Sequence, residues 1–220
     1  MLLTSQAALQ ISPREANDER RLHFYAKGED IPLITLGVWQ VYKGLVQMST
    51  LSLNGEEVLL GWAGIGNFFG HWLSQSFIKF PSKEQPSLYI SYKALSDVYL
   101  KWYSIDEIEA SPRLSQIMLP QLVRRIRQVE TLLTIKGQKR VEDRLQHLLL
   151  LLKQEMGQPV PGGTCINARL THQNLANAIN TTRVTITRIL NEFKRQGWIA
   201  LDGKRQIILK DGHFPSVSDW

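Results

Sequence analysis

The spacing of the apolar residues changes near Ser104 from alternation to helical repetition. Before Ser104, apolar and polar residues alternate in short runs that turn residues interrupt, which predicts strands with one buried face. After Ser104, apolar residues recur three or four positions apart, which is the spacing of one face of a helix. A chain that carries both patterns in separate blocks is expected to have an α+β fold, with a small barrel or jelly roll at its N-terminal end.

The strand-rich block runs from about Leu22 to Tyr103. Asn54-Gly55 separates two alternating runs in this block, and because both residues tolerate a positive φ angle, the pair predicts a hairpin with a tight turn. Residues 74–87 contain two prolines among serines and lysines, which indicates a loop.

A long helix is predicted from Pro112 to about Lys136. Ser111 suits the N-cap and Pro112 suits the first helical position, where a missing N–H costs nothing. Pro120 lies inside this helix and should bend it or mark a restart. The apolar stripe of the helix consists of Leu114, Met118, Leu122, Ile126, Val129 and Leu133. Such a stripe suits a dimer seam, packing on the chain's own barrel, or both on opposite faces.

A second helix is predicted after a hinge at Gly137 and the polar run 138–140. Its apolar residues lie between Val141 and Leu152, and it should stop near Gly157. Residues 158–163 contain two prolines and two glycines, and we interpret them as a loop.

Residues 170–196 have the pattern of a helix-turn-helix motif. Thr171 can cap the first helix, but Asn174 stands where a glutamate or glutamine would complete a capping box, so only a partial cap is expected. Asn180 accepts the left-handed conformation of a sharp turn, and Thr182 can cap a second helix that starts at Arg183. The apolar positions of the two helices are Leu175, Ala178, Ile179, Ile186, Ile189, Leu190 and Phe193.

Two strand-like runs follow the second helix and flank the segment Asp202-Gly203-Lys204-Arg205. The Asp-Gly pair favours a tight turn, so we interpret this segment as a hairpin wing with a basic tip. The net charge of +6 points the same way. Residues 1–135 hold 13 Lys or Arg and 13 Asp or Glu, whereas residues 136–220 hold 13 and 7. A basic module attached to a neutral one suggests either a polyanion-binding domain next to a separate sensing or assembly domain, or a basic domain whose charge serves solubility alone.

Nine residues are candidates for contacts with double-stranded DNA. Arg183 and Arg188 can pair with guanine in the major groove, and Val184 offers an apolar surface to a thymine methyl group. Residues at helix starts can hold phosphates. The candidates are Thr171, His172, Gln173, Thr182, Arg183, Val184, Thr185, Thr187 and Arg188. The alternative for the two arginines is a solvated polar helix face, which the complete motif makes the weaker interpretation.

The sequence resembles the CRP/FNR family of bacterial transcription regulators from Leu22 to about Lys210. The resemblance rests on segments 24–28, 41–44, 54–57 and 65–70 in the barrel, on residues 121–126 in the long helix, and above all on residues 170–190. The last of these looks closest to the nitrogen-control branch of the family, NtcA.

The resemblance implies three parts. These are a β-roll of the cyclic-nucleotide-binding type at residues 1–110, a dimerisation helix with a hinge at 111–137, and a winged helix-turn-helix at 138–220. It also implies a homodimer that reads a palindrome, with GTA and TAC half-sites eight base pairs apart, so that the half-site centres lie about one helical turn apart. Activation, with RNA polymerase as the partner, is the usual role in this branch.

Four residues match positions at which the nitrogen-control branch binds 2-oxoglutarate, namely Phe69, Gly70, Arg125 and Glu130. Arg125 would pair with a ligand carboxylate. The barrel arginine expected near Ser87 is replaced, which removes one of two clamps for a dicarboxylate. A regulator without an effector, controlled by its abundance or by a partner protein, is the alternative.

Three other effectors are disfavoured. The residues with which family members bind cyclic AMP are absent, and without the arginine the cyclic phosphate lacks its counter-charge. An iron–sulfur sensor needs several cysteines, whereas Cys165 is the only one in the sequence. His71 lies near the position of the ligand histidine of haem-dependent sensors, but one histidine among aromatic residues is more often structural.

Other classes of protein lack support in the sequence. It contains no Ser/His/Asp set, Walker loop or metal-ligand cluster that would indicate an enzyme or a metal site. The longest apolar run, 148–152, is far too short to span a membrane, and the N-terminus lacks the features of a signal peptide, so we expect a cytoplasmic protein with no membrane partner. A non-specific architectural DNA-binding protein is the remaining alternative, although it would not need a neutral β-roll.

Overall fold

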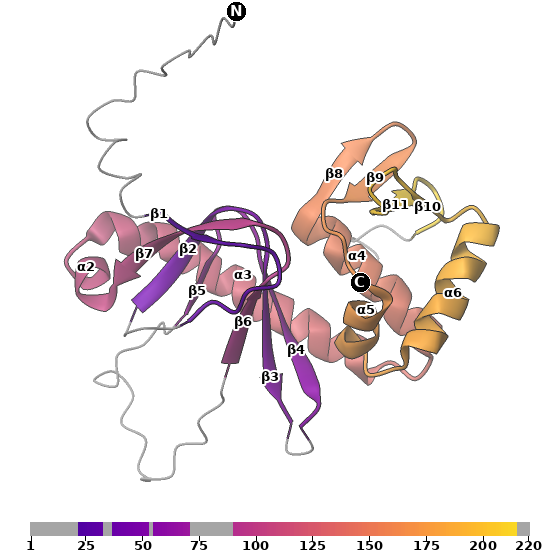
Figure 1. Cartoon of the computed structure of the whole chain (residues 1–220), viewed down its shortest axis with the longest axis horizontal. Helices are drawn as coiled ribbons and strands as arrows, with labels where there is room; N and C mark the ends of the chain where they lie inside the picture. Colours follow the sequence, from indigo (N-terminus) through magenta and orange to yellow (C-terminus); the bar gives the residue numbers. More distant parts are fainter. Residues whose placement is uncertain (1–21, 33–36, 53–54, 71–89, 215–220) are drawn as a thin grey trace, which may run out of the picture.

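Two antiparallel sheets form the N-terminal β-roll of the computed structural model, which describes residues 22–32, 37–52, 55–70 and 90–214 (Figure 1). The first sheet has the strand order β1-β7-β2-β5 and the second the order β4-β3-β6. The strands are β1 (Leu22–Tyr25), β2 (Gly37–Lys43), β3 (Val46–Leu51), β4 (Glu57–Ala63), β5 (Phe68–Gly70), β6 (Ile90–Ala94) and β7 (Val98–Ser104). The predicted alternation is confirmed in β7, where Val98 and Leu100 are buried and Tyr99 is exposed.

The two sheets share one apolar core. Its centre is aromatic: the ring of Trp39 meets that of Trp102 edge-on with 4.7 Å between centroids, and Phe69 of the first sheet lies 4.9 Å from Tyr92 of the second. The Phe69–Tyr92 contact joins the two sheets face to face, which is the arrangement expected for a jelly roll, whereas the tryptophan pair lies within the first sheet.

The hairpin predicted around Asn54-Gly55 is present. Leu51 at the end of β3 pairs with Glu57 at the start of β4, and Gly55 has a φ angle of +76°. Asn54 itself, the loop predicted at 74–87 and His71 all lie outside the described residues.

A short helix, α2 (Ile105–Glu109), follows β7 and is not predicted by the apolar spacing. A capping box starts it: the Glu107 N–H donates to Ser104 Oγ, and the Ser104 N–H donates to the Glu107 carboxylate. Five residues are too few to show a periodic stripe, so the only local signal for this helix is its cap.

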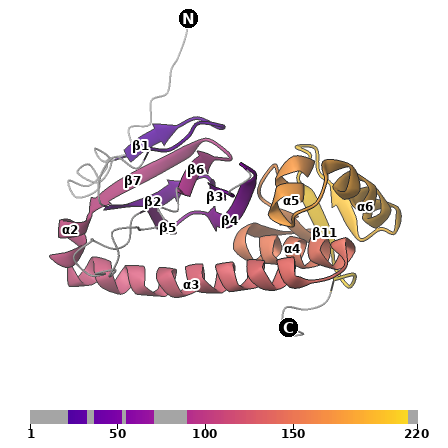
Figure 2. The same ribbon diagram turned by 90° about the horizontal axis from the view of Figure 1, so that it is seen from below.

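The long helix, α3 (Pro112–Gly137), begins and ends where the sequence predicts. Its cap is also confirmed, since the Leu114 N–H donates to Ser111 Oγ. Of the two outcomes expected at Pro120, a bend or a restart, the restart is wrong, because one helix runs through this residue. Pro120 is exposed, so water can bond the carbonyl oxygen that the missing N–H leaves free. Figure 2 shows α3 running along both the β-roll and the C-terminal part.

A third sheet lies in the C-terminal part, after α4 (Val141–Met156). The expected loop at 158–163 is wrong: β8 (Gly157–Val160) and β9 (Gly163–Ile166) form a hairpin there. Pro159 is compatible with a strand because β8 lies at the edge of the sheet β10-β11-β9-β8, where a ladder hydrogen bond is not required.

The helix-turn-helix and the wing complete the fold. They comprise α5 (His172–Ala178), α6 (Arg183–Arg195), β10 (Ile199–Leu201) and β11 (Ile207–Lys210). Their buried faces form one apolar cluster with α4, and Leu45, Leu59 and Trp62 of the β-roll belong to the same cluster. The α+β fold, with a β-roll, a long helix and a C-terminal winged helix-turn-helix, is therefore confirmed.

Candidate functional site

The start of α5 is more completely capped than the sequence suggests. The Asn174 N–H donates to Thr171 Oγ1 at 3.1 Å, and the Thr171 N–H donates to Asn174 Oδ1 at 2.9 Å. The expectation of a partial cap is wrong, because the shorter asparagine side chain still reaches the backbone of the cap residue. Both Thr171 and Gln173 are exposed at this end of α5, where free N–H groups and the helix dipole favour an anion.

The turn between the two helices has the predicted geometry. Asn180 adopts a φ angle of 52°, and Thr182 Oγ1 accepts from the Thr185 N–H at 3.1 Å to cap α6. Thr182 and Thr185 also join their hydroxyl groups, 2.9 Å apart. The Thr181 N–H donates to the Ala176 carbonyl at 3.0 Å, which ties the start of α6 to the end of α5.

The two faces of α6 differ sharply. Ile186, Ile189, Leu190 and Phe193 are buried on the inner face, as predicted. Arg183, Val184 and Arg188 are exposed on the outer face, and the side chain of Val184 is 78% exposed. An isopropyl group so open to water, between two arginines, gains nothing from folding. The outer face of α6 therefore presents two arginines and an apolar group that are not engaged in packing the chain.

His172 and Thr187 connect the two helices directly. Thr187 Oγ1 donates to the Arg183 carbonyl at 2.9 Å and lies 2.7 Å from His172 Nδ1. Because the hydroxyl proton is engaged with Arg183, Nδ1 of His172 must be the donor in the second bond. Thr187 therefore orients the imidazole of His172. Of the nine candidate residues, Thr187 is one that can act by positioning another candidate as well as by contacting DNA itself.

The wing places two cations at its tip. Asp202 Oδ1 accepts from the N–H groups of Lys204 and Gln206, at 2.9 and 2.7 Å, and so closes the loop between β10 and β11. Lys204 and Arg205 are exposed. The tight turn expected at Asp202-Gly203 is present, since the Arg205 N–H donates to the Asp202 carbonyl at 3.0 Å, and Arg205 follows it in the left-handed conformation with φ 61°.

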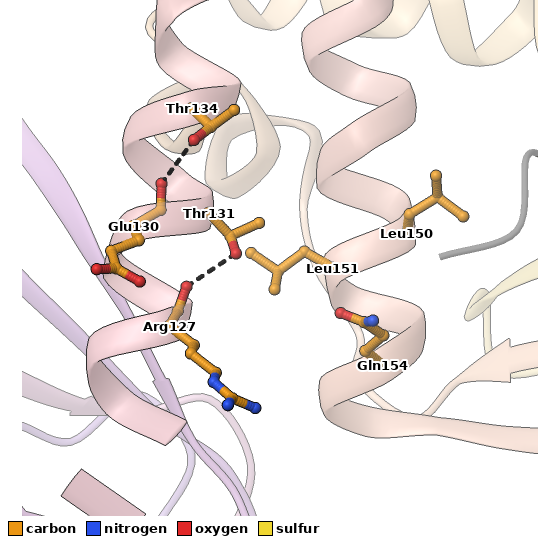
Figure 3. Close-up of a pocket in the computed structure, with 7 residues that line it drawn as sticks. All are labelled: Arg127, Glu130, Thr131, Thr134, Leu150, Leu151 and Gln154. Carbon is orange, nitrogen blue, oxygen red and sulfur yellow. Dashed lines mark hydrogen bonds between the residues drawn. The ribbon is translucent and has the colours of Figure 1, made fainter. Parts of the chain in front are cut away.

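Two of the four predicted effector residues line one pocket, and the other two do not. Gly70 and Arg125 line a pocket of about 280 Å³ between the β-roll and α3. Its other walls are Met48, Phe68, Ile90, Tyr92, Leu122 and Ile126. Phe69 is buried in the β-roll core behind this pocket, against Tyr92. Glu130 lines a separate pocket of about 340 Å³ between α3 and α4, together with Arg127 and Thr134 (Figure 3).

Arg125 is the cation of the first pocket. Its Nη1 donates at 2.8 Å both to the Leu60 carbonyl and to Gln128 Oε1, which are neutral acceptors. Burial lowers the pKa of the guanidinium, and the neighbouring Tyr92 and Glu155 act in the opposite sense. Burial has the opposite effect on the Tyr92 hydroxyl, because it raises the pKa of this group to about 12, so the side chain of Tyr92 stays neutral. A partly buried guanidinium without a hydrogen-bonded carboxylate among the described residues is suited to an anionic ligand.

Gln128 and Gly61 are structural residues of this site that the sequence patterns do not single out. The pairing of β3 with β4 shifts between Met48 and Ser49, so Leu60 has no partner in the ladder and β4 bulges. Two backbone groups beside the bulge bond to α3: the Trp62 N–H donates to Gln128 Oε1 at 3.1 Å, and Arg125 reaches the Leu60 carbonyl. A Cβ on Gly61, whose φ angle is +141°, would meet both side chains.

The described residues offer neither a metal site nor a membrane-spanning helix. Within the described ranges, no group of three or more His, Cys, Asp or Glu residues is arranged to hold a metal ion. In that same part of the chain, no helix combines the length and the apolar character that crossing a membrane requires.

A winged helix-turn-helix with an exposed arginine-bearing helix, joined by a long helix to a β-roll with a pocket, defines a DNA-binding regulator. Residues 143–213 match the model of the Crp-like helix-turn-helix domain. The regulatory protein CysR of Synechococcus elongatus is 33% identical over 165 residues, which cover 74% of this chain and 71% of CysR. The chain therefore belongs to the CRP/FNR family of transcription regulators, whose members are not enzymes.

Two other relatives are consistent with this assignment. The global nitrogen regulator of Synechococcus elongatus is 29% identical over 172 residues, covering 76% of this chain and 75% of that protein. A CRP/FNR-family regulator from Thermus thermophilus superposes with a TM-score of 0.63 at 22% identity, covering 86% of this chain and 93% of the other. At that identity the superposition shows the shared fold alone.

Proposed function

We propose that the protein is a homodimeric transcription activator that reads a palindrome through α6 and responds to a small anionic effector. The observation that carries this proposal is the outer face of α6, where Arg183, Val184 and Arg188 are exposed above a buried inner face. Residues 1–110 would form the sensor, 111–137 the dimerisation helix and 138–220 the DNA-binding domain.

The dimer seam is proposed on the face of α3 that the β-roll leaves open. Met118, Leu132 and Ile135 are buried on the inner face. The outer face carries a separate apolar stripe made of Leu119, Val123, Ile126 and Leu133, with side chains 44–66% exposed. Its spacing of four, three and seven residues is that of a coiled-coil seam. Glu130 lies four residues after Ile126 and three before Leu133, so it occupies the intermediate seam position and would also lie at the seam.

The palindrome is proposed from the resemblance and from the chemistry of α6. An arginine pairs with guanine through two hydrogen bonds, and a valine contacts a thymine methyl group, which suits GTA half-sites with their complementary TAC. The start of α5 and the wing tip would contact phosphates on either side. A dimer presents two such helices related by two-fold symmetry.

The effector is proposed to place a carboxylate against Arg125 in the pocket between the β-roll and α3. The resemblance to the nitrogen-control branch makes 2-oxoglutarate the first compound to test. Among the described residues that line the pocket, Arg125 is the one cation, and the others are mainly apolar. One carboxylate of 2-oxoglutarate would pair with Arg125, whereas the second carboxylate has no cationic partner among these residues.

Sequence-specific DNA binding can be tested by fluorescence anisotropy at fixed salt. One labelled duplex carries GTA and TAC half-sites separated by eight base pairs, and the other carries a scrambled sequence. Arg188→Ala should weaken binding to the palindrome by about 30-fold or more, because a dimer loses two guanine pairs at about 1 kcal/mol or more each. Arg195→Ala is the matched control, since Arg195 is an exposed arginine of the same helix that is engaged with Glu192. Equal binding of wild type and Arg188→Ala would contradict the assignment of α6 as the reading helix.

The alternatives correspond to other results of the same titration. Equal affinity for palindrome and scrambled DNA would indicate a non-specific architectural protein. Palindrome binding that 2-oxoglutarate leaves unchanged would indicate another effector or none. Stronger binding with 2-oxoglutarate, abolished in Arg125→Ala, would support the proposed effector site.

The activator role is proposed from the same branch resemblance, with RNA polymerase in the cytoplasm as the partner. In a purified transcription reaction, the protein should increase the transcript from a template that carries the palindrome upstream of the promoter. A decrease would show a repressor instead.

A further inference from the structure

A contact between the β-roll and the helix-turn-helix lies outside both sites described above. The β3–β4 hairpin reaches α5 (Figures 1 and 2). There, Asn177 Nδ2 donates to Glu57 Oε2 at 3.1 Å, which joins residues 120 positions apart in the sequence. The other carboxylate oxygen, Glu57 Oε1, accepts from Gln47 Nε2 at 2.9 Å, and the side chain of Gln47 is buried.

The hydrogen bonds continue to the surface proposed to meet DNA. Gln173 Nε2 donates to Asn177 Oδ1 at 2.6 Å, one helical turn along α5. Gln47, Glu57, Asn177 and Gln173 thus form one interdomain hydrogen-bond chain. At its DNA end, Gln173 is exposed and is one of the candidate phosphate contacts.

The chemistry of the chain fixes the direction of each amide. The ionised carboxylate of Glu57 only accepts, so Asn177 must turn its NH₂ group toward it. The Asn177 carbonyl then faces Gln173, which must donate in turn. A carboxylate in the β-roll therefore determines how a side chain is presented on the DNA-binding domain. A bond to a charged acceptor also strengthens the next bond along the chain.

Strand β4 contacts both α5 of the helix-turn-helix and α3, the proposed dimerisation helix. Leu59 of β4 is buried in one cluster with Leu175 and Ala178 of α5. At the next residue of the strand, the Leu60 carbonyl accepts from Arg125 of α3, and two residues further the Trp62 N–H donates to Gln128 of α3. One strand is therefore held to the proposed seam helix on one side and to the helix-turn-helix on the other.

We propose that Glu57 is a positioning residue for DNA recognition. Through Asn177 it holds the helix-turn-helix against the β3–β4 hairpin, and so it sets the separation at which the two reading helices of a dimer meet their half-sites. This inference rests on the proposed function, because the separation matters only to a dimer that reads a palindrome. Without the hydrogen bond from Asn177 to Glu57, the DNA-binding domain is held by apolar packing, by the ion pair between Arg124 of α3 and Glu155 of α4, and by the connection between α3 and α4, and it can match other spacings.

The experiment measures spacing discrimination rather than affinity alone. Anisotropy titrations at fixed salt compare the eight-base-pair spacer with spacers of seven, nine and ten base pairs. Asn177→Asp places a second carboxylate against Glu57 and should reduce the preference for eight base pairs at least fivefold. The added negative charge near DNA should also lower the affinity for every duplex, including one with a single half-site. It should do so by the same factor at each spacing, so it does not alter the preference for eight base pairs.

A charge relocation provides the rescue. In the double variant Glu57→Gln/Asn177→Asp, residue 57 gains an NH₂ group that can donate to the new carboxylate. Gln47 can still donate to residue 57, and Gln173 can still donate to residue 177. The spacing preference should return to within about twofold of wild type. Glu56→Ala is the matched control, because Glu56 is the adjacent exposed glutamate of the same hairpin, and it should leave the preference unchanged.

The outcomes separate this inference from the function on which it rests. If wild type prefers the palindrome but Asn177→Asp keeps the full spacing preference, or if the double variant is no better than the single one, the positioning role is wrong and the proposed function stands. If wild type shows no preference for the palindrome over scrambled DNA, the proposed function fails and this inference fails with it.

Discussion

Single residues decide how the β-roll meets the long helix. Gly61, Arg125 and Gln128 meet at the bulge of β4, where two backbone groups bond to side chains of α3. Gln128 is nearly fully buried, and its Oε1 accepts from both Arg125 and the Trp62 N–H. A buried amide of this kind is stable only while its partners are in place.

Gly61→Ala should destabilise the protein by about 3 kcal/mol. The change forces an alanine into a φ angle of +141° and pushes its Cβ against Gln128 and Arg125, so strain adds to the loss of buried hydrogen bonds. Urea denaturation would measure the free energy of unfolding. Gly66→Ala is the control, since Gly66 also has a positive φ angle but has open space around its Cβ, and about 1 kcal/mol is expected there. Equal losses in the two variants would contradict the role of close packing at Gly61.

Among the elements, α3 has two faces with different tasks. Its inner face packs on the β-roll and on α4, and its outer face exposes the stripe made of Leu119, Val123, Ile126 and Leu133. The predicted stripe mixed residues of both faces: Met118 is buried and Ile126 is exposed. Residues of the two stripes are interspersed along the sequence of α3, so their spacing does not separate them. Tertiary packing decides which stripe is buried within the chain.

Ile126→Glu should convert the dimer into monomers, because two carboxylates would meet at the seam without counter-charges. Sedimentation equilibrium would measure the association. Affinity for the palindrome should fall with the loss of the second reading helix, while the fold stays intact because the side chain is 57% exposed.

Val184→Glu is the matched control for this prediction. It is the same kind of change, from an exposed apolar residue to glutamate, but on the outer face of α6. It should leave the dimer intact and abolish DNA binding. Dissociation of both variants, or of neither, would show that the stripe of α3 is not the seam.

In the whole molecule, charge is separated between the two ends. The excess of +6 belongs to residues 136–220, and within that part the wing tip exposes Lys204 and Arg205. The β-roll lies at the other end of the molecule from α6 (Figure 1). Attraction to phosphates should therefore arise from one end alone.

Lys204→Gln should weaken binding to the palindrome and to scrambled DNA by similar factors. It should also lower the slope of log affinity against log salt by about one unit for each phosphate that the protein no longer neutralises. Anisotropy titrations at several salt concentrations would measure this slope. Lys93→Gln, which changes an exposed lysine on β6 of the β-roll, should leave the slope as it is in wild type. An equal effect of both variants would mean that the β-roll also binds DNA.

The sequence by itself determined the features whose causes are local. The caps at Thr171 and Thr182, the left-handed Asn180, the inner face of α6 and the bounds of α3 follow from neighbouring residues, because helical spacing and capping act within a few positions. The exposed residues of α6 were therefore identifiable in advance.

The tertiary structure alone decided the features that join distant residues. It made residues 157–166 a hairpin, because β9 pairs with β11 more than 40 positions later. It brought Gly70 and Arg125 to one pocket and placed Glu130 in another. It also joined Glu57 to Asn177 across 120 residues. Such contacts depend on how whole elements pack against one another, and no pattern within a short stretch of sequence records that packing.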